Sequence, residues 1–296
     1  MNNPFRGCGT ALVSPFAADL SVDEAAYRRL IRFQIEQGID FIVPCGTTGE
    51  TPTLSQAEHL RLLQVAVAEA KAGPRRVPVL GGAGGNATEH VVELARRLEG
   101  LGVDGVLSVA PYYNKPTQEG LYQHFKAVAG AVQLPVVLYN VPGRTSSNIE
   151  ARTALRLAAI PNIVAVKEAS GNLSQIGAII AAAPPGFDVL SGDDAMTLAI
   201  LALGGQGLVS VASNAVPGPM TDLVRRARAG DYTGARELHY RYLPLMEAIF
   251  IESSPGPVKH VLARMGYCQE TYRLPMVPVQ PGSREKLAAV MQGVGL

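Results

Sequence analysis

The chain has no tryptophan, few cysteines and almost no net charge. Its 26 basic and 25 acidic side chains leave a formal net charge of +1, which gives no long-range field to attract nucleic acid or anionic lipid. Its three cysteines, at positions 8, 45 and 268, are far apart and odd in number, so they indicate neither a disulfide framework nor a zinc site. We therefore expect no nucleic acid, membrane or metal as a partner.

Long apolar runs are also missing. No segment approaches the roughly eighteen uninterrupted apolar residues of a membrane-spanning helix, and MNNPFRGCGTALVSPF at the N-terminus lacks the basic patch and long apolar core of a signal peptide. We therefore expect a cytoplasmic protein. With 296 residues, 47% of them hydrophobic, the chain can bury a sizeable core.

What the sequence does contain is a repeated rhythm of short β-rich runs with helical patterns between them. Eight such units in about 220 residues predict a (β/α)8 TIM barrel. An open doubly wound sheet is the main alternative, but no G-x-G-x-x-G can be laid on the glycine-rich GGAGGNATEH. The runs are CGTALVSPF (8–16), FIVPCG (41–46), VPVLGGAG (77–84), GVLSVAP (105–111), PVVLYNVP (135–142), IVAVKEAS (163–170), DVLSGDD (188–194) and GLVSVASN (207–214).

The pattern changes to helices alone after the last run. We expect residues 1–216 to hold the barrel strands and the helices between them. Residues 217–296 should then form the last barrel helix and a C-terminal helical layer of the same domain.

The stretch NIVAVKEASG places Lys167 near the C-terminal end of an apolar run. Strand alternation allows this side chain to face the interior of the barrel, at the end where barrel enzymes carry their chemistry. Desolvation there disfavours the ammonium form, and a neutral amine can condense with a carbonyl to give an imine. The alternative is a structural lysine that pairs with a carboxylate such as Asp193 or Glu50.

Other polar groups follow neighbouring runs. PCGTTGE can bring backbone amides and the hydroxyls of Thr47 and Thr48 onto a small anion, although an ordinary turn would look the same. A tyrosine at position 112, 113 or 139 could relay protons, or merely pack. Arg144 could grip a carboxylate. These groups all fall at one predicted end of the barrel.

Six motifs in order resemble one family: GTTGE (46–50), PYYNKP (111–116), YNVPGRT (139–145), VKEAS (166–170), SGDD (191–194) and GLVSV (207–211). Together they resemble the dihydrodipicolinate synthase and N-acetylneuraminate lyase family of pyruvate-dependent class I aldolases, from about residue 5 to about residue 280. YNVPGRT and GLVSV resemble the synthase branch, whose arginine corresponds to Arg144.

The resemblance implies a role for each matching residue. Lys167 would form the imine with pyruvate, and Thr48 would hold the pyruvate carboxylate. Tyr139 would relay protons, linked to Thr47 and to Tyr113 from an adjacent subunit. The remaining implied substrate-binding residues are Arg144 for the carboxylate of L-aspartate-4-semialdehyde, and Gly192 and Val209 near the imine.

The implied product is 4-hydroxy-tetrahydrodipicolinate, an intermediate of diaminopimelate and lysine biosynthesis. The resemblance implies no metal or organic cofactor, and it implies a homotetramer built from tight dimers.

A possible effector site is also implied by the resemblance. Lysine-inhibited members bind lysine at a dimer interface, at places matching Gln56, His59, Asn86, His90 and Tyr112. Position 90 usually holds glutamate in those enzymes. An imidazole there removes the charge partner of an ammonium group, a loss of about 2 kcal/mol in a desolvated site. We therefore expect weak or absent inhibition by lysine.

Several other functions stay open. A metal-dependent aldolase would need clustered ligands, but the five histidines are dispersed. A pyridoxal phosphate enzyme would need a phosphate cradle beside the lysine, and a noncatalytic barrel is possible in principle. The nearest alternative is a paralogous aldolase, lyase or dehydratase that acts on another aldehyde or 2-oxo acid. SSPGPVK (253–259) departs from the synthase pattern, because synthases often have asparagine before the first proline and a larger residue at Gly256.

Overall fold

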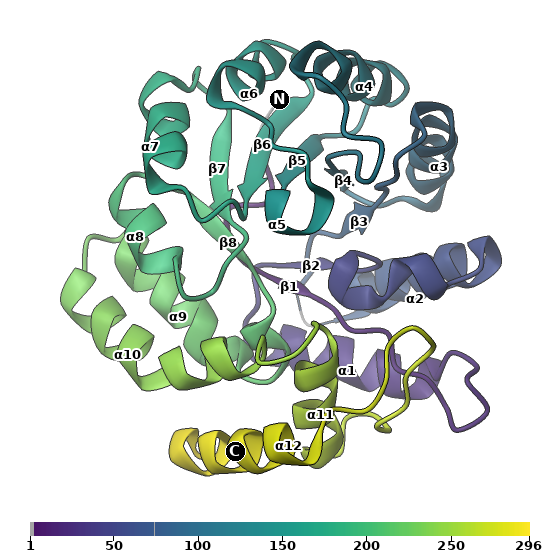
Figure 1. The fold of residues 1–296 in the computed structure, drawn as a ribbon, viewed down its shortest axis with the longest axis vertical. Helices are drawn as coiled ribbons and strands as arrows, with labels where there is room; N and C mark the ends of the chain where they lie inside the picture. The colour runs from purple at the N-terminus through teal and green to yellow at the C-terminus, as the bar shows by residue number, and fades with distance from the viewer. Residues whose placement is uncertain (1–2, 74) are drawn as a thin grey trace.

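Eight parallel strands close into a barrel in the computed structural model, which describes residues 3–73 and 75–296 (Figure 1). The strand order is β2-β1-β8-β7-β6-β5-β4-β3. A parallel bridge between Ile42 and Val79 joins the two ends of this order, so the predicted TIM barrel is confirmed. The strands are β1 (Gly7–Ala11), β2 (Phe41–Val43), β3 (Leu80–Gly82), β4 (Gly105–Val109), β5 (Val136–Asn140), β6 (Ile163–Glu168), β7 (Asp188–Ser191) and β8 (Gly207–Ser210).

Helices surround the strands, and the C-terminal ones form a further layer at the lower side of Figure 1. The helices around the barrel are α1 (Glu24–Glu36), α2 (Gln56–Ala72), α3 (Thr88–Leu101), α4 (Gln118–Gly130), α5 (Pro142–Thr145), α6 (Ala151–Ala158), α7 (Leu173–Ala182), α8 (Thr197–Ala202) and α9 (Pro217–Arg228). The layer holds α10 (Tyr232–Ala248), α11 (Gly256–Arg264) and α12 (Pro281–Val294). Short 3-10 turns are η1 (Thr47–Gly49), η2 (Thr51–Thr53) and η3 (Ala212–Asn214).

The core lies in and around the strands, because almost every strand residue is buried. Parallel strands covered by helices read as apolar runs for this reason. The seam between β2 and β3 needs a glycine: a Cβ built on Gly82 would lie 2.0 Å from the carbonyl oxygen of Cys45. The amide of Gly82 donates to the carbonyl of Pro44 across the same seam, at 3.0 Å.

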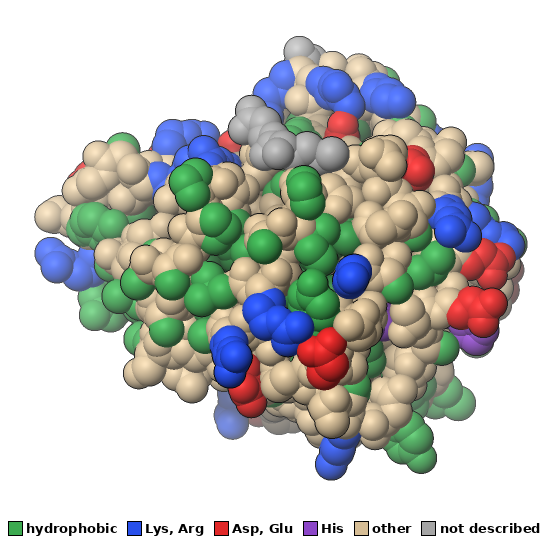
Figure 2. Space-filling view, turned by 90° about the horizontal axis from the view of Figure 1, so that it is seen from above, with side chains coloured by type: hydrophobic (Ala, Val, Ile, Leu, Met, Phe, Trp, Pro, Cys, Tyr) green, Lys and Arg blue, Asp and Glu red, His purple; other side chains and the backbone are tan. Residues whose placement is uncertain are grey.

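The surface shows no sign of a charged binding face in the view seen from above. Figure 2 shows basic, acidic and apolar side chains interspersed there. Within residues 3–73 and 75–296, no helix is long and apolar enough to cross a membrane.

Candidate functional site

Lys167 lies on β6 near its C-terminal end and is only 6% exposed. Its neighbour across the β5–β6 pair is Tyr139, and the Lys167 Nζ atom lies 3.9 Å from the centroid of the Tyr139 ring. Both side chains line a cavity of about 170 Å³. The structure thus places the predicted nucleophile beside the predicted proton relay.

Lys167 forms no ion pair with any carboxylate among the described residues. Glu50, one of the two partners expected for a structural lysine, instead binds Lys259, with 2.6 Å between Glu50 Oε1 and Lys259 Nζ. Asp193 borders the same cavity as Lys167 without forming an ion pair. The hypothesis of a Glu50–Lys167 pair is therefore wrong.

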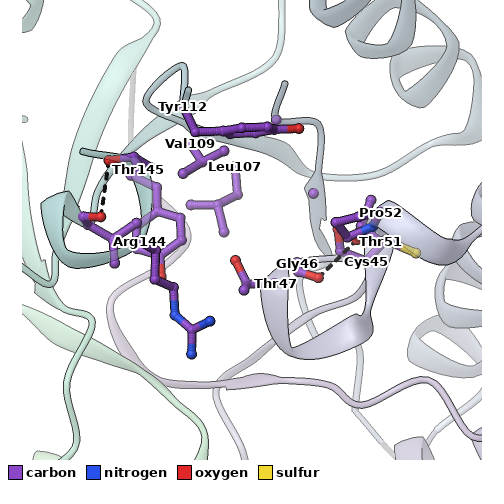
Figure 3. A pocket seen from close by; sticks show the side chains of 14 residues that line it. Cys45, Gly46, Thr47, Thr51, Pro52, Leu107, Val109, Tyr112, Arg144 and Thr145 are labelled. Carbon is purple, nitrogen blue, oxygen red and sulfur yellow. Dashed lines mark hydrogen bonds between the residues drawn. The ribbon is translucent and has the colours of Figure 1, made fainter. Parts of the chain in front are cut away.

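A second cavity of about 400 Å³ is also bordered by Tyr139, and Tyr112 lies in its wall (Figure 3). Its lining is Cys45, Gly46, Thr47, Thr51, Pro52, Gly82, Gly84, Leu107, Val109, Tyr112, Tyr139, Val141, Arg144 and Thr145. The smaller cavity is lined by Thr47, Thr48, Tyr139, Val141, Arg144, Lys167, Ala169, Gly192, Asp193, Val211, Phe250 and Ser254. Four residues border both: Thr47, Tyr139, Val141 and Arg144.

The η1 turn brings a group of small and hydroxylic residues to the cavities. The Gly49 amide donates to the Gly46 carbonyl at 3.0 Å, and the Thr51 hydroxyl donates to the carbonyl of Cys45 at 2.6 Å. Thr48 is buried, whereas Thr47 is exposed to the cavity that Figure 3 shows. A tight turn of this kind leaves hydroxyl groups and backbone amides available to a small anion.

A buried ion pair between Glu50 and Lys259 lies beside this turn, and the sequence analysis did not predict it. Glu50 follows η1 in the left-handed region, with φ of 52°, and its carboxylate binds Lys259 of α11. Lys259 also donates to the carbonyl of Thr271 at 2.9 Å and lies over the ring of Phe16. Burial raises the pKa of Glu50 and lowers the pKa of Lys259.

A second buried carboxylate holds the loop after β8. Asp194 is 1% exposed and accepts hydrogen bonds from the amides of Val211 and Ala212, at 3.0 and 3.1 Å, and from the Ser210 hydroxyl. Burial raises its pKa, although these donors oppose the rise. These contacts join the loop that contains Gly192 to the end of β8, and Val211 borders the smaller cavity.

The structure brings most of the predicted site residues together, but not all. Lys167, Tyr139, Thr47, Thr48, Arg144 and Gly192 border the smaller cavity. Val209 is buried in β8 and does not border it, whereas Val211 does. Tyr113 is 89% exposed, with φ of +73°, and borders neither cavity. Its predicted role would need a second subunit.

The predicted effector residues are more scattered within one chain. Tyr112 borders the larger cavity, whereas Gln56 and His90 are exposed and Asn86 is half-buried. His59 is buried, its Nε2 atom lies 2.9 Å from the Gly82 carbonyl oxygen, and burial lowers its pKa. The ring of His59 is thus already engaged by its own chain.

Sequence reasoning missed two cavity residues from the C-terminal part of the chain. Phe250 and Ser254, in the connection between α10 and α11, border the smaller cavity with Lys167. The only signal for them was the break SSPGP between two helical patterns. In the part of the chain that the structure describes, no three His, Cys, Asp or Glu side chains are grouped as metal ligands.

Comparisons with known proteins agree with this geometry. A family model described as the dihydrodipicolinate synthetase family matches residues 4–294. A relative from Koribacter versatilis, named 4-hydroxy-tetrahydrodipicolinate synthase, is 59% identical over 292 residues, covering 98% of this chain and 96% of the relative. A relative of the same name from Acidobacterium capsulatum is 55% identical, with the same coverage.

Solved structures give the same result. The crystal structure of dihydrodipicolinate synthase from Aquifex aeolicus is 43% identical, with a TM-score of 0.96 over 99% of each chain. The enzyme from Cyanidioschyzon merolae, solved with lysine bound, is 40% identical, with a TM-score of 0.96 over 100% of each chain.

Proposed function

The chain belongs to the dihydrodipicolinate synthetase family, and from this premise we propose that it condenses pyruvate with L-aspartate-4-semialdehyde to give 4-hydroxy-tetrahydrodipicolinate. It is a lyase of the class I aldolase type. The observation that carries the proposal is Lys167, a buried lysine without a carboxylate partner among the described residues, at the mouth of the barrel and beside a tyrosine.

The first step uses the amine of Lys167. Its Nζ atom attacks the ketone carbon of pyruvate, water leaves, and an imine remains. The imine withdraws electrons from the adjacent methyl group, which loses a proton and gives an enamine. Tyr139 lies close enough to serve this step, since its ring is 3.9 Å from Nζ. Its hydroxyl would carry protons to and from the imine, with Thr47 next in the relay.

The two substrates need separate carboxylate contacts. Thr48 and the amides of η1 would hold the pyruvate carboxylate, because this turn borders the cavity that contains Lys167. Arg144 borders the same cavity and has an exposed side chain. Its guanidinium would bind the carboxylate of the semialdehyde through two parallel hydrogen bonds. Gly192 would line the imine, and Val209 would support the strand behind it.

The second step forms the carbon–carbon bond. The enamine carbon attacks the aldehyde carbon of the semialdehyde, which becomes an alkoxide and takes up a proton. The amino group of that substrate then attacks the imine carbon, the ring closes, and Lys167 leaves as the free amine. Atoms balance with the loss of one water in imine formation, and no oxidant or reductant is consumed.

A homotetramer built from tight dimers is part of the proposal. Tyr113 supports it, because a tyrosine that is 89% exposed in one chain is poorly placed to act there alone. Leu173 and Leu203 are further large apolar side chains, 36% and 46% exposed, that a subunit contact would cover. An active, strictly monomeric enzyme would contradict the role given to Tyr113. The free thiols Cys8, Cys45 and Cys268 are compatible with a cytoplasmic location.

One alternative has a specific observation in its favour. Ser254 borders the cavity at a place where synthases that resemble this chain often have asparagine. A hydroxyl in place of an amide in the cavity wall favours a paralogous aldolase, lyase or dehydratase that acts on another aldehyde or 2-oxo acid.

Intact mass spectrometry after incubation with pyruvate and borohydride tests the proposal. The wild type should gain the mass of a reduced pyruvate adduct, and Lys167→Ala should not. Aspartate semialdehyde should consume the adduct before borohydride traps it. An adduct that is indifferent to the semialdehyde would support the paralogous aldolase, and a complete lack of adduct would refute the imine mechanism.

A further inference from the structure

A buried polar cluster lies behind the two residues of the proposed imine chemistry. Asn140 directly follows Tyr139 on β5, and Glu168 directly follows Lys167 on β6. Because successive strand residues face opposite sides, Asn140 and Glu168 point away from the cavity. Both are 0% exposed. Asn140 Nδ2 donates to Glu168 Oε1 at 2.8 Å, so one hydrogen bond joins the outer faces of the strands.

Neutral donors hold the Glu168 carboxylate, since no cation among the described residues pairs with it. Gln175 Nε2 donates to Oε1 at 3.0 Å. The hydroxyl and the amide of Ser170 donate to Oε2, at 2.6 and 3.2 Å. Burying a carboxylate carries a large desolvation penalty even when it is hydrogen-bonded. A buried carboxylate of this kind adds little to the free energy of unfolding, but its hydrogen bonds favour one alignment of the two strands.

The pairing of β5 with β6 contains an irregularity, so other contacts must favour the observed register over a shifted one. Val136 pairs with Ile163 and Val137 pairs with Ala165, so Val164 is an extra residue on β6. A shift of one residue would exchange the two faces of the strand and turn Lys167 out of the cavity. The bond between Asn140 and Glu168 lies beyond the irregularity, at the last pair of the ladder.

The cluster also holds the segment that follows Arg144. Asn140 Oδ1 accepts from the amide of Ile149 at 2.9 Å, and Asn140 Nδ2 also donates to Asn148 Oδ1 at 2.9 Å. Asn148 in turn donates to Gln175 on α7 at 2.9 Å. One group of side chains therefore connects β5, β6, α7 and the segment after α5.

We propose that Asn140 and Glu168 are positioning residues that hold Tyr139 against Lys167 for imine formation. This role rests on the proposed function. Substitution of either residue should leave the same residues around the cavity, but the position of Tyr139 relative to Lys167 should become less fixed. Misplacement by about 1 Å can lower a rate by about a hundredfold.

The test compares Glu168→Gln with a matched control, Asp188→Asn. Gln keeps the size of the side chain but removes the charge and one acceptor oxygen. Asp188 is also a buried carboxylate, 5% exposed, on the neighbouring strand β7, where Asn3 and Arg6 bind it. It pairs with Ala165, two residues before Lys167 and outside the cavity lining. Both variants are assayed well below their melting temperatures.

The rate of the Lys167–pyruvate adduct, trapped by borohydride and read by intact mass, should fall about tenfold to a hundredfold in Glu168→Gln. At saturating pyruvate kcat should fall as well, with little change in KM for the semialdehyde. Asp188→Asn should lose stability but keep the wild-type trapping rate.

Ser170→Ala provides a milder change if Glu168→Gln does not fold, because it removes only the hydroxyl donor to Oε2. It should slow trapping severalfold. Wild-type trapping rates in Glu168→Gln, or in Ser170→Ala if only that variant folds, would overturn the positioning role and leave the proposed function intact. A wild-type enzyme that forms no pyruvate adduct would overturn the proposed function itself, and this role with it.

Discussion

Arg144 offers the clearest separation of the two proposed half-reactions at the scale of single residues. Arg144→Ala should lower kcat/KM for the semialdehyde about tenfold to a hundredfold, since a charge-assisted bidentate contact contributes about 1.5–3 kcal/mol. Trapping of the pyruvate adduct on Lys167 should persist. Arg152→Ala, an exposed arginine on α6, is the matched control. Equal losses in trapping and in semialdehyde use would contradict the assigned role.

A second prediction for a single residue concerns His90 and inhibition by lysine. It is exposed, and an imidazole in place of the glutamate of lysine-inhibited relatives offers no anion to an ammonium group. Steady-state rates should therefore change little up to millimolar lysine, and His90→Glu should increase the sensitivity. Potent inhibition of the wild type by millimolar or lower lysine would contradict this prediction.

The placement of single residues could be predicted where it follows from local spacing. Strand alternation placed Lys167 toward the interior, and the motif at 139–145 placed Tyr139 and Arg144 at the same rim. Pairings across long separations were not predictable. Glu50 and Lys259 are 209 residues apart in sequence, and nothing local to either residue names its partner.

The contact between α3 and α4 predicts a pH dependence at the scale of elements. His124 on α4 is 4% exposed, its Nδ1 atom lies 2.9 Å from the Thr88 hydroxyl of α3, and burial lowers its pKa from 6.5 to about 4. The unfolded chain therefore binds the proton more readily between these values. The free energy of unfolding should decrease as the pH falls from 6.5 towards 4, by up to about 3 kcal/mol from this group.

Urea unfolding at several pH values checks this expectation. His124→Gln should flatten the slope between pH 6.5 and 4. His59 and His239 also have lowered pKa values, so some slope should remain. An unaltered slope in His124→Gln would show that protonation of His124 does not cause the decrease in the free energy of unfolding at low pH.

The contact between α11 and the turn after β2 predicts a large effect on stability. Lys259→Met leaves the Glu50 carboxylate buried without its cation, which should lower the free energy of unfolding by about 3–5 kcal/mol. Adding Glu50→Gln should recover much of that loss. Arg61→Met, which breaks the exposed pair with Glu24, should change it by less than about 1 kcal/mol. Denaturant titration of the wild type and the three variants measures these differences, and similar losses in Lys259→Met and Arg61→Met would contradict the argument.

Element types were easier to predict than element ends. The helix Gln56–Ala72 begins at Ser55 through a reciprocal bond with Glu58, which is a local signal. Several β-rich runs proved longer than their strands: residues 77–84 contain only β3 at Leu80–Gly82. The surplus apolar residues Val77, Val79 and Ala83 are buried in the core, and periodicity cannot distinguish that burial from a strand.

The whole molecule should unfold as one unit, although α10, α11 and α12 add a helical layer to the barrel. Arg273, between α11 and α12, donates to the carbonyl of Thr53 at 2.8 Å and pairs with Glu58 of α2. Such contacts join the end of the chain to its first third. Far- and near-ultraviolet circular dichroism should therefore report coincident thermal transitions, and two separated transitions would show that the layer unfolds independently.

The fold was predictable at this scale because βα repetition restricts the topology, whereas the exposure of individual side chains was not. A single sequence shows which tyrosines follow a strand, but not how exposed each of them is in the folded chain. Tyr113 illustrates the difference, since its motif was evident and its 89% exposure was not.

The four residues that border both cavities have a consequence for how related enzymes can diverge. A change in Thr47, Tyr139, Val141 or Arg144 alters two spaces at once, so natural selection has little freedom there. Phe250 and Ser254 border only the smaller space and lie outside the strands. New substrate preferences in this lineage should therefore arise first in the connection between α10 and α11, while the barrel itself stays constant.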